Sequence, residues 1–178
     1  MNTSHYPSAT YAVTIERRTL AVIVDNEPGV LARVIGLFSA RGYNIESLTV
    51  SETEHDKHIS RITIVTAGTP QILEQIKHQL DRLVPVHRIV DLTQEGDTLE
   101  RELALVKVRG TGEKRLESMR LAQAFGAKMV DATLESFVFE LTGTSDEVER
   151  FIRLMASVGL TEVARTGIAA LARGAAGV

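Results

Sequence analysis

The sequence predicts an α+β protein in which one order of elements, strand–helix–strand–strand–helix–strand, occurs twice. Three observations support this class. Short apolar or alternating runs typical of strands are interleaved with stretches whose apolar residues recur at helical spacing. A polar segment, residues 93–98, divides the 178-residue chain into two parts. Each part contains the same series, although the two sequences hardly match.

The first unit is expected at residues 19–92 and begins with a buried strand, Leu20 to Val24. A helix follows, because one set of apolar residues lies at helical spacing and Gly42 then provides a left-handed C-terminal stop. Asn26 is expected to cap this helix, with Pro28 in its first turn. The residues of the stripe are Val30, Leu31, Val34, Ile35 and Phe38.

The remainder of the first unit completes a split βαβ arrangement. Tyr43 to Val50 reads as a second strand, and His58 to Thr66 alternates as a strand exposed on one face. Thr69 followed by Pro70 predicts a second helix, and residues 84–92 form the last strand. This order is the ferredoxin-like one, with both helices on one sheet face. The other face then needs a cover or a partner.

The second unit is expected at residues 99–178, after a linker at 93–98. Thr144 and Glu147 form a capping box before the strongest helical stripe of the chain. The C-terminal residues 169–177 are expected to fray. The expected strands are 99–109, 128–134, 137–141 and 160–166, and the expected helices are 113–125 and 144–158.

Composition excludes several classes of protein. The chain has no cysteine, which removes disulfides and thiol catalysis and fits a reducing compartment. A net charge of −3 argues against a nucleic-acid module. Residues 1–18 lack the apolar segment of a signal peptide and are read as a flexible leader. No apolar run approaches the roughly 20 residues that span a bilayer, so a cytoplasmic protein is expected.

The turn before the first helix is the best candidate binding site. The amides of Gly29, Val30 and Leu31 are expected to be first-turn donors at the positive end of the helix dipole. Gly29 lets an anion approach the backbone, and the Asn26 amide can both donate and accept. These features suit a free amino acid. The alternative is a plain capped strand-to-helix turn.

Four sequence segments resemble one family, the small regulatory subunit of acetohydroxyacid synthase (acetolactate synthase). The first two are Asn26-Glu-Pro-Gly-Val-Leu-Ala-Arg-Val and Leu37-Phe-Ser-Ala-Arg-Gly-Tyr-Asn-Ile-Glu-Ser-Leu48. The others are Glu102-Leu-Ala-Leu-Val-Lys-Val and Glu162-Val-Ala-Arg-Thr-Gly. The Pro-Gly-Val-Leu turn is shared by many ACT domains, whereas Arg-Gly-Tyr-Asn-Ile-Glu-Ser-Leu is more specific. The resemblance runs from about Thr19 to Gly174.

The resemblance implies a regulatory protein of branched-chain amino acid biosynthesis. It implies that the first unit is an ACT domain that forms a homodimer and binds valine or a related amino acid. The chain would bind and activate the catalytic large subunit and confer feedback inhibition. No cofactor is expected on this chain; thiamine diphosphate, Mg and FAD are expected only on the catalytic partner. The implied effector-binding residues are Asn26, Gly29, Val30 and Leu31 of one chain and Asn44 and Ile45 of the opposing chain.

Other functions remain as alternatives at this stage. An ACT-domain sensor could act on a different enzyme or on a transcription factor. An RNA-recognition module has the same strand order but needs aromatic residues on its central strands, and 20–25 and 58–66 have none. His55, Asp56 and His58 suggest a metal, although solvated loop residues explain them better. No catalytic constellation or metal site is therefore predicted.

Overall fold

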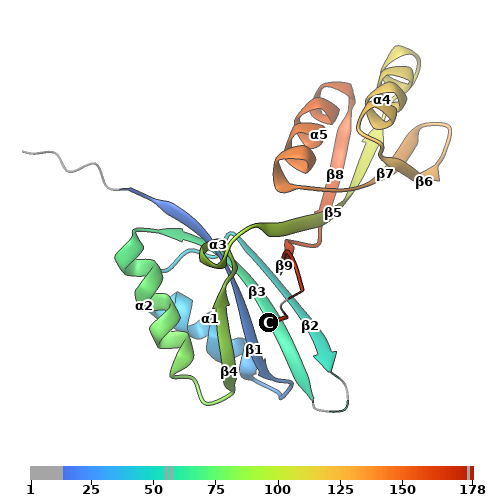
Figure 1. The fold of residues 1–178 in the computed structure, drawn as a ribbon. Helices are drawn as coiled ribbons and strands as arrows, with labels where there is room; N and C mark the ends of the chain where they lie inside the picture. The colour runs from blue at the N-terminus through green and yellow to red at the C-terminus, as the bar shows by residue number, and fades with distance from the viewer. Residues whose placement is uncertain (1–13, 55, 57, 176) are drawn as a thin grey trace, which may run out of the picture.

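The computed structural model describes residues 14–54, 56, 58–175 and 177–178. It contains two antiparallel sheets, each with a pair of helices packed on one face (Figure 1). The predicted α+β class with two ferredoxin-like units is therefore confirmed. The two units have the same strand order and are joined by strand β5, which runs from one to the other.

The first domain has the sheet order β2-β3-β1-β4. Its strands are β1 Glu16–Asp25, β2 Ser47–Glu54, β3 Ile59–Gly68 and β4 Val86–Asp91. Its helices are α1 Val30–Arg41 and α2 Pro70–Asp81. Apolar residues of β1 and β3 pack against both helices, with Val34, Phe38 and Ile76 almost fully buried. The edges of this sheet are β2 and β4.

The second domain repeats this arrangement in the order β6-β7-β5-β8. Its strands are β5 Thr98–Arg109, β6 Lys128–Ala132, β7 Ser136–Gly143 and β8 Leu160–Arg165. Its helices are α4 Glu113–Ala124 and α5 Ser145–Val158. A second core forms between this sheet and the two helices, and it includes Phe139, Phe151 and Met155.

Two expected boundaries differ from the structure. Strand β1 begins at Glu16, inside the expected leader 1–18, of which residues 1–13 lie outside the described part of the chain. Arg18 is held in this strand by an ion pair of 2.7 Å between its Nη1 and Asp91 Oδ2 of β4. The expected linker 93–98 contains most of a short helix, α3 Leu92–Glu95, because the Asp91 side chain accepts a hydrogen bond from the Gln94 amide at 3.2 Å.

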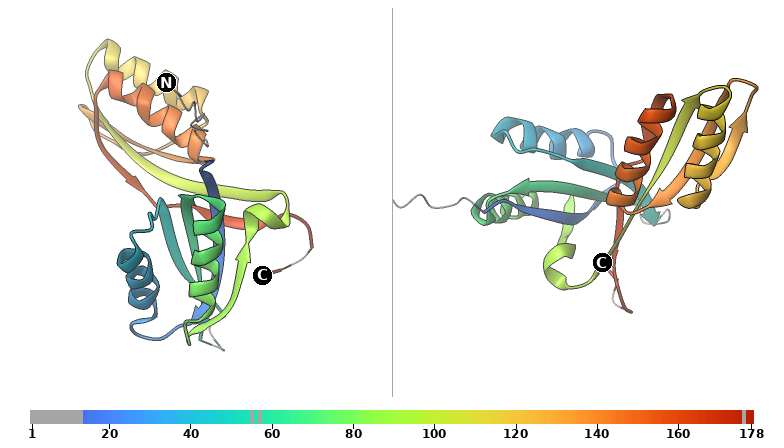
Figure 2. Two further views of the ribbon diagram at one scale, coloured as in Figure 1. Left: turned by 90° about the vertical axis from the view of Figure 1, so that its left-hand side faces the viewer. Right: turned by 90° about the horizontal axis from the view of Figure 1, so that it is seen from above.

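The largest difference concerns the C-terminal residues. Instead of fraying, Ala169–Ala172 forms strand β9, which pairs with the first residues of β5. Together β9 and β5 make a two-stranded ribbon beside the open face of the first sheet (Figure 2). Ile168 and Ala170 pack there in a third apolar cluster with Ala21 and Val65. The sheet face that was expected to need a partner is therefore partly covered by the same chain.

Helix α5 begins with the predicted capping box, and this contact can be tested. The Glu147 amide donates to Thr144 Oγ1 at 3.4 Å, and the Thr144 amide donates to the Glu147 carboxylate at 2.7 Å. We expect Thr144→Ala to lower the free energy of unfolding by about 1 kcal/mol, whereas Thr144→Ser keeps the hydroxyl and should be close to wild type. Chemical denaturation of both variants measures this, and equal losses would contradict the capping role.

The contribution of this capping box to the stability of the protein should depend on pH. Two hydrogen bonds from Thr144 lower the pKa of Glu147. The one from the Thr144 backbone has the larger effect, and the one from its side chain has the smaller effect. A carboxyl whose folded pKa is depressed adds stability above its unfolded pKa and loses that contribution as the pH falls through the folded value. The stability difference between wild type and Thr144→Ala should therefore shrink in acid, below the usual pKa range of glutamate.

Candidate effector site at helix α1

The turn before α1 is built on the backbone conformation of Gly29. This residue is the N-cap of the helix, with φ 88° and ψ −10°, in the left-handed region that favours glycine. Asn26 was expected to cap the helix, and this is wrong: there is no side-chain cap, and the helix begins at Val30. Pro28 precedes the helix instead of lying in its first turn. The turn thus depends on Gly29 and not on a capping side chain.

Three backbone donors at this helix start, the amides of Gly29, Leu31 and Ala32, remain free within the described part of the chain. The Val30 amide donates to the Glu27 carbonyl at 3.3 Å, so it is not one of them. The other three amides have no acceptor among the described residues. A Cβ added at Gly29 would meet nothing within 4 Å, so space is open beside these donors. The turn can therefore present three N–H groups to an anion at the positive end of the helix dipole.

The side chains around the turn divide into buried and available groups. Val30 is 4% exposed and belongs to the first core, and its amide is already bonded to Glu27, so it offers a ligand neither its side chain nor a free N–H group. Leu31 is 37% exposed. Asn26 is exposed, and its side chain has no hydrogen-bond partner among the described residues. Its backbone N–H donates to the His58 carbonyl at 2.6 Å. Asn26 and Leu31 are thus the side chains that a ligand could reach.

The other two predicted residues lie at the opposite end of α1. Gly42 ends the helix in the left-handed conformation, and Asn44 and Ile45 follow it. The Asn44 carbonyl accepts a hydrogen bond from Thr66 Oγ1 at 2.6 Å, and Ile45 packs against the first core. A helix of 12 residues is about 18 Å long. Within one chain these residues cannot share a small-molecule site with Asn26, so the six-residue site remains a prediction that requires a second copy.

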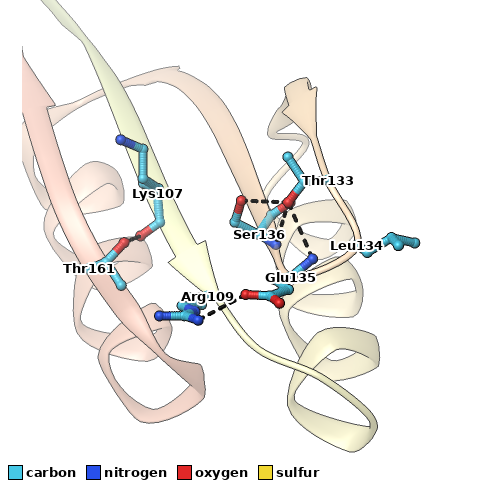
Figure 3. Close-up of a pocket in the computed structure, with 7 residues that line it drawn as sticks. All are labelled: Lys107, Arg109, Thr133, Leu134, Glu135, Ser136 and Thr161. Atoms are coloured by element: carbon cyan, nitrogen blue, oxygen red, sulfur yellow. Dashed lines mark hydrogen bonds and ion pairs between the residues drawn. The ribbon is translucent and has the colours of Figure 1, made fainter.

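A hollow on the open face of the second sheet was not predicted (Figure 3). Its charges are already paired. It has a volume of about 580 Å³. Arg109 Nη2 lies 2.8 Å from Glu135, and Lys107 Nζ lies 2.6 Å from Glu162. The hydrogen bond to Glu162 raises the pKa of Lys107. Leu134, on its rim, is 90% exposed. These are exposed ion pairs of small energetic value, and they leave no free charge for a ligand.

The described residues show no cluster of metal ligands and no membrane-spanning helix. There, no group of three or more His, Cys, Asp or Glu side chains could hold a metal ion. His55, considered with His58 as a metal ligand, lies outside that part of the chain. Among the same residues, no helix has both the length and the apolar character needed to cross a membrane.

Comparison with known proteins covers both domains. A family model for the AHAS small subunit-like ACT domain matches residues 20–88, and one for the small subunit of acetolactate synthase matches residues 101–174. A relative from Archaeoglobus fulgidus, named as a probable acetolactate synthase small subunit, is 47% identical over 158 residues, covering 89% of this chain and 98% of the relative. The chain belongs to the acetolactate synthase small-subunit family.

Further members of the family agree in sequence and in structure. The acetolactate synthase isozyme 3 small subunit of Escherichia coli is 46% identical over 159 residues, which is 89% of this chain and 96% of that protein. The crystal structure of the Thermotoga maritima acetolactate synthase small subunit aligns with a TM-score of 0.81 and 37% identity, covering 90% of this chain and 99% of that one. The resemblance found in the sequence is confirmed, and the first domain is an ACT domain of this family.

Proposed function

We propose that this chain binds the catalytic large subunit of acetohydroxyacid synthase, raises its activity and makes it sensitive to feedback inhibition by valine. The observation that carries the proposal is the match along about nine-tenths of the chain to proteins named as acetolactate synthase small subunits. The free amides of Gly29 and Leu31 in the ACT domain support an amino-acid effector, because they offer donors for its carboxylate.

The effector site requires two copies of the chain. One copy contributes Asn26, Gly29, Val30 and Leu31 and the other contributes Asn44 and Ile45. The sheet order supports this pairing, because β2 is an edge strand and Asn44 and Ile45 directly precede it. An unpaired edge invites a second strand, and a two-fold arrangement would create two equivalent sites.

The cofactors belong to the partner in this proposal. Thiamine diphosphate, Mg²⁺ and FAD bind to the large subunit, and this chain supplies no catalytic residue. Its influence on the reaction is exerted through contact with the large subunit and through the occupancy of the effector site.

Reconstitution of the two purified subunits tests the function. Acetolactate formation by the large subunit should rise severalfold as this chain is added, and valine should inhibit only the mixture that contains both subunits. Bovine serum albumin in place of the chain controls for non-specific stabilisation. If the chain neither raises activity nor introduces valine sensitivity, the proposal fails and an ACT-domain sensor for another enzyme becomes the better explanation.

The homodimer is tested separately. We expect sedimentation equilibrium to show a dimer at micromolar concentration with valine present, since both edges of the first sheet, β2 and β4, are unpaired in the single chain. A monomer under these conditions would mean that the six predicted residues cannot form one site.

A further inference from the structure

A second cavity, unrelated to the turn before α1, lies between the first sheet and the β5–β9 ribbon. It has a volume of about 470 Å³, within the range of roughly 300–1,000 Å³ usual for small-molecule sites. Strands β2 and β3 contribute one side, and residues 99–101 and 169–171 the other. Leu99 and Leu171, which pair across the ribbon, give that side an apolar character.

Thr63 of β3 places an unused hydroxyl at this cavity. The residue is only 4% exposed and lines the cavity. It follows Ile62 and precedes Ile64, which point into the helix-covered core, so the Thr63 side chain lies on the opposite face. Within the described part of the chain its hydroxyl has no hydrogen-bond partner. The Thr63 hydroxyl is open to the cavity and has no partner among the described residues to displace, so it is available to donate a hydrogen bond to a ligand.

Arg61, two residues earlier on β3, brings a positive charge to the same cavity. Its Nη2 donates to the Ala170 carbonyl of β9 at 2.6 Å. Among the side chains that the structure describes, which do not include that of Glu54, no carboxylate forms an ion pair with the Arg61 guanidinium. Partial burial lowers the pKa of Arg61. Two other arginines do form ion pairs with carboxylates: the buried Arg18 with Asp91, and the exposed Arg165 with Glu102. Arg61 is partly buried and only one of its guanidinium nitrogens is bonded to a described residue, so its other N–H groups are available to a carboxylate.

We propose that this cavity binds a small carboxylate with an apolar body. The carboxylate accepts hydrogen bonds from the Arg61 guanidinium, whose planar fork matches carboxylate geometry, and from the Thr63 hydroxyl. The apolar body lies against Leu99 and Leu171. Arg101, which also lines the cavity, adds a second positive charge. This site does not depend on the proposed effector site, because the two helices of the domain lie on the opposite sheet face.

Because the ligand would touch both β3 and β9, its binding should also hold the C-terminal ribbon on the first sheet. Arg61 already makes this connection through Ala170, and Thr49 Oγ1 of β2 donates to the Ile168 carbonyl at 2.8 Å. A ligand that binds only the folded state raises the midpoint of thermal unfolding. We therefore expect octanoate to stabilise the full chain in a concentration-dependent way.

Calorimetric titration of the full chain with octanoate tests the site. We expect saturable binding at about one octanoate per chain, at least tenfold weaker in Arg61→Met, which keeps the apolar stem and removes the charge. Thr63→Val, which has nearly the same shape, should weaken binding severalfold. Arg82→Met is the matched control, since Arg82 is exposed and does not line the cavity, and it should bind as wild type. Circular dichroism verifies that each variant is folded.

Two further ligands identify the chemistry. Octanol has the same chain without the charge and should bind at least tenfold more weakly than octanoate. Octyl phosphate should bind more weakly than octanoate if the site is built for a carboxylate. Equal affinity for octanol and octanoate, tighter binding of octyl phosphate, unchanged affinity in folded Arg61→Met and Thr63→Val, or no octanoate binding by wild type would each overturn the proposal.

Discussion

Gly29→Asp should abolish the response to valine while leaving activation of the large subunit intact. The new carboxylate would lie beside the free amides of Gly29 and Leu31 and compete with the carboxylate of the effector. Two like charges about 4 Å apart repel by roughly 1 kcal/mol in water and about 4 kcal/mol near a protein surface. Since about 1.4 kcal/mol is a factor of ten in affinity, valine binding should weaken tenfold or more.

The conformation of Gly29 determines the control for this experiment. Its φ of 88° would strain any residue with a Cβ, by about 1–2 kcal/mol, so the helix-dipole preference for aspartate does not make the change harmless. Gly29→Asn imposes similar strain and similar size without the charge. Asn26→Ala should act like Gly29→Asp but more weakly, since it removes polar contacts without adding repulsion.

Calorimetry with valine on the folded, dimeric variants distinguishes charge from strain. The account predicts a large loss of affinity in Gly29→Asp and a smaller one in Gly29→Asn, with similar losses of stability in both. If both variants bind valine equally well, or if Gly29→Asp binds it with wild-type affinity, the turn before α1 does not hold the carboxylate.

Gly159→Ala should destabilise the protein much more than an alanine substitution at Gly126, another glycine with positive φ. Gly159 ends α5 with φ 110°, and a Cβ there would lie 2.1 Å from the Arg109 carbonyl oxygen of β5. Both partners are backbone, tied by a hydrogen bond of 2.8 Å from the Arg109 amide to the Gly159 carbonyl. Strain and overlap together should cost about 3 kcal/mol or more, mainly in the second domain.

Gly126→Ala is the matched control for that substitution. Gly126 follows α4 with a positive φ of 67°, but a Cβ there would meet nothing within 4 Å. It should therefore show only the backbone strain, about 1 kcal/mol. In thermal unfolding we expect the midpoint of Gly159→Ala to fall by about 10 °C or more, well beyond that of Gly126→Ala. Similar midpoints for the two variants would show that the close contact at Arg109 relaxes easily.

Local sequence signals predicted much of the fold. Thr144 with Glu147, Thr69 before Pro70, and Gly42 after the last periodic residue of α1 all occupy the predicted capping positions. Each of these signals acts within four residues, so it can be recognised without knowledge of the remainder of the chain. The repeated order of strands and helices then led to the ferredoxin-like topology of both domains.

The failure at the C-terminal residues involves contacts between distant segments, whereas the failure at Asn26 is local to one turn. Ala169 to Ala172 carries no apolar stripe that separates it from a frayed end, and β9 forms because β5 and the open first sheet lie beside it. Arg61 and Thr63 line a cavity only because β9 lies over their face of the first sheet, so the sequence of β3 alone could not indicate this site. Asn26 was assigned as a cap because the positive φ of Gly29 cannot be inferred from residue type alone.

The candidate effector site could be predicted only in part. The Pro-Gly turn identified the start of α1, and the structure places three free amides there. Asn44 and Ile45 came from the family resemblance, and in one chain they lie at the far end of α1. Their role depends on a second copy, which neither hydrophobic periodicity nor the single chain can provide.

Titration of the purified protein with valine, leucine and isoleucine by calorimetry tests the central claim most directly. We expect saturable valine binding at one site per chain, since two-fold symmetry would create two equivalent sites per dimer. Binding should be weakened by Asn26→Ala and by Asn44→Ala, one from each side of the proposed interface. A folded dimer that binds none of the three amino acids, or that binds valine equally well in both variants, would contradict the account.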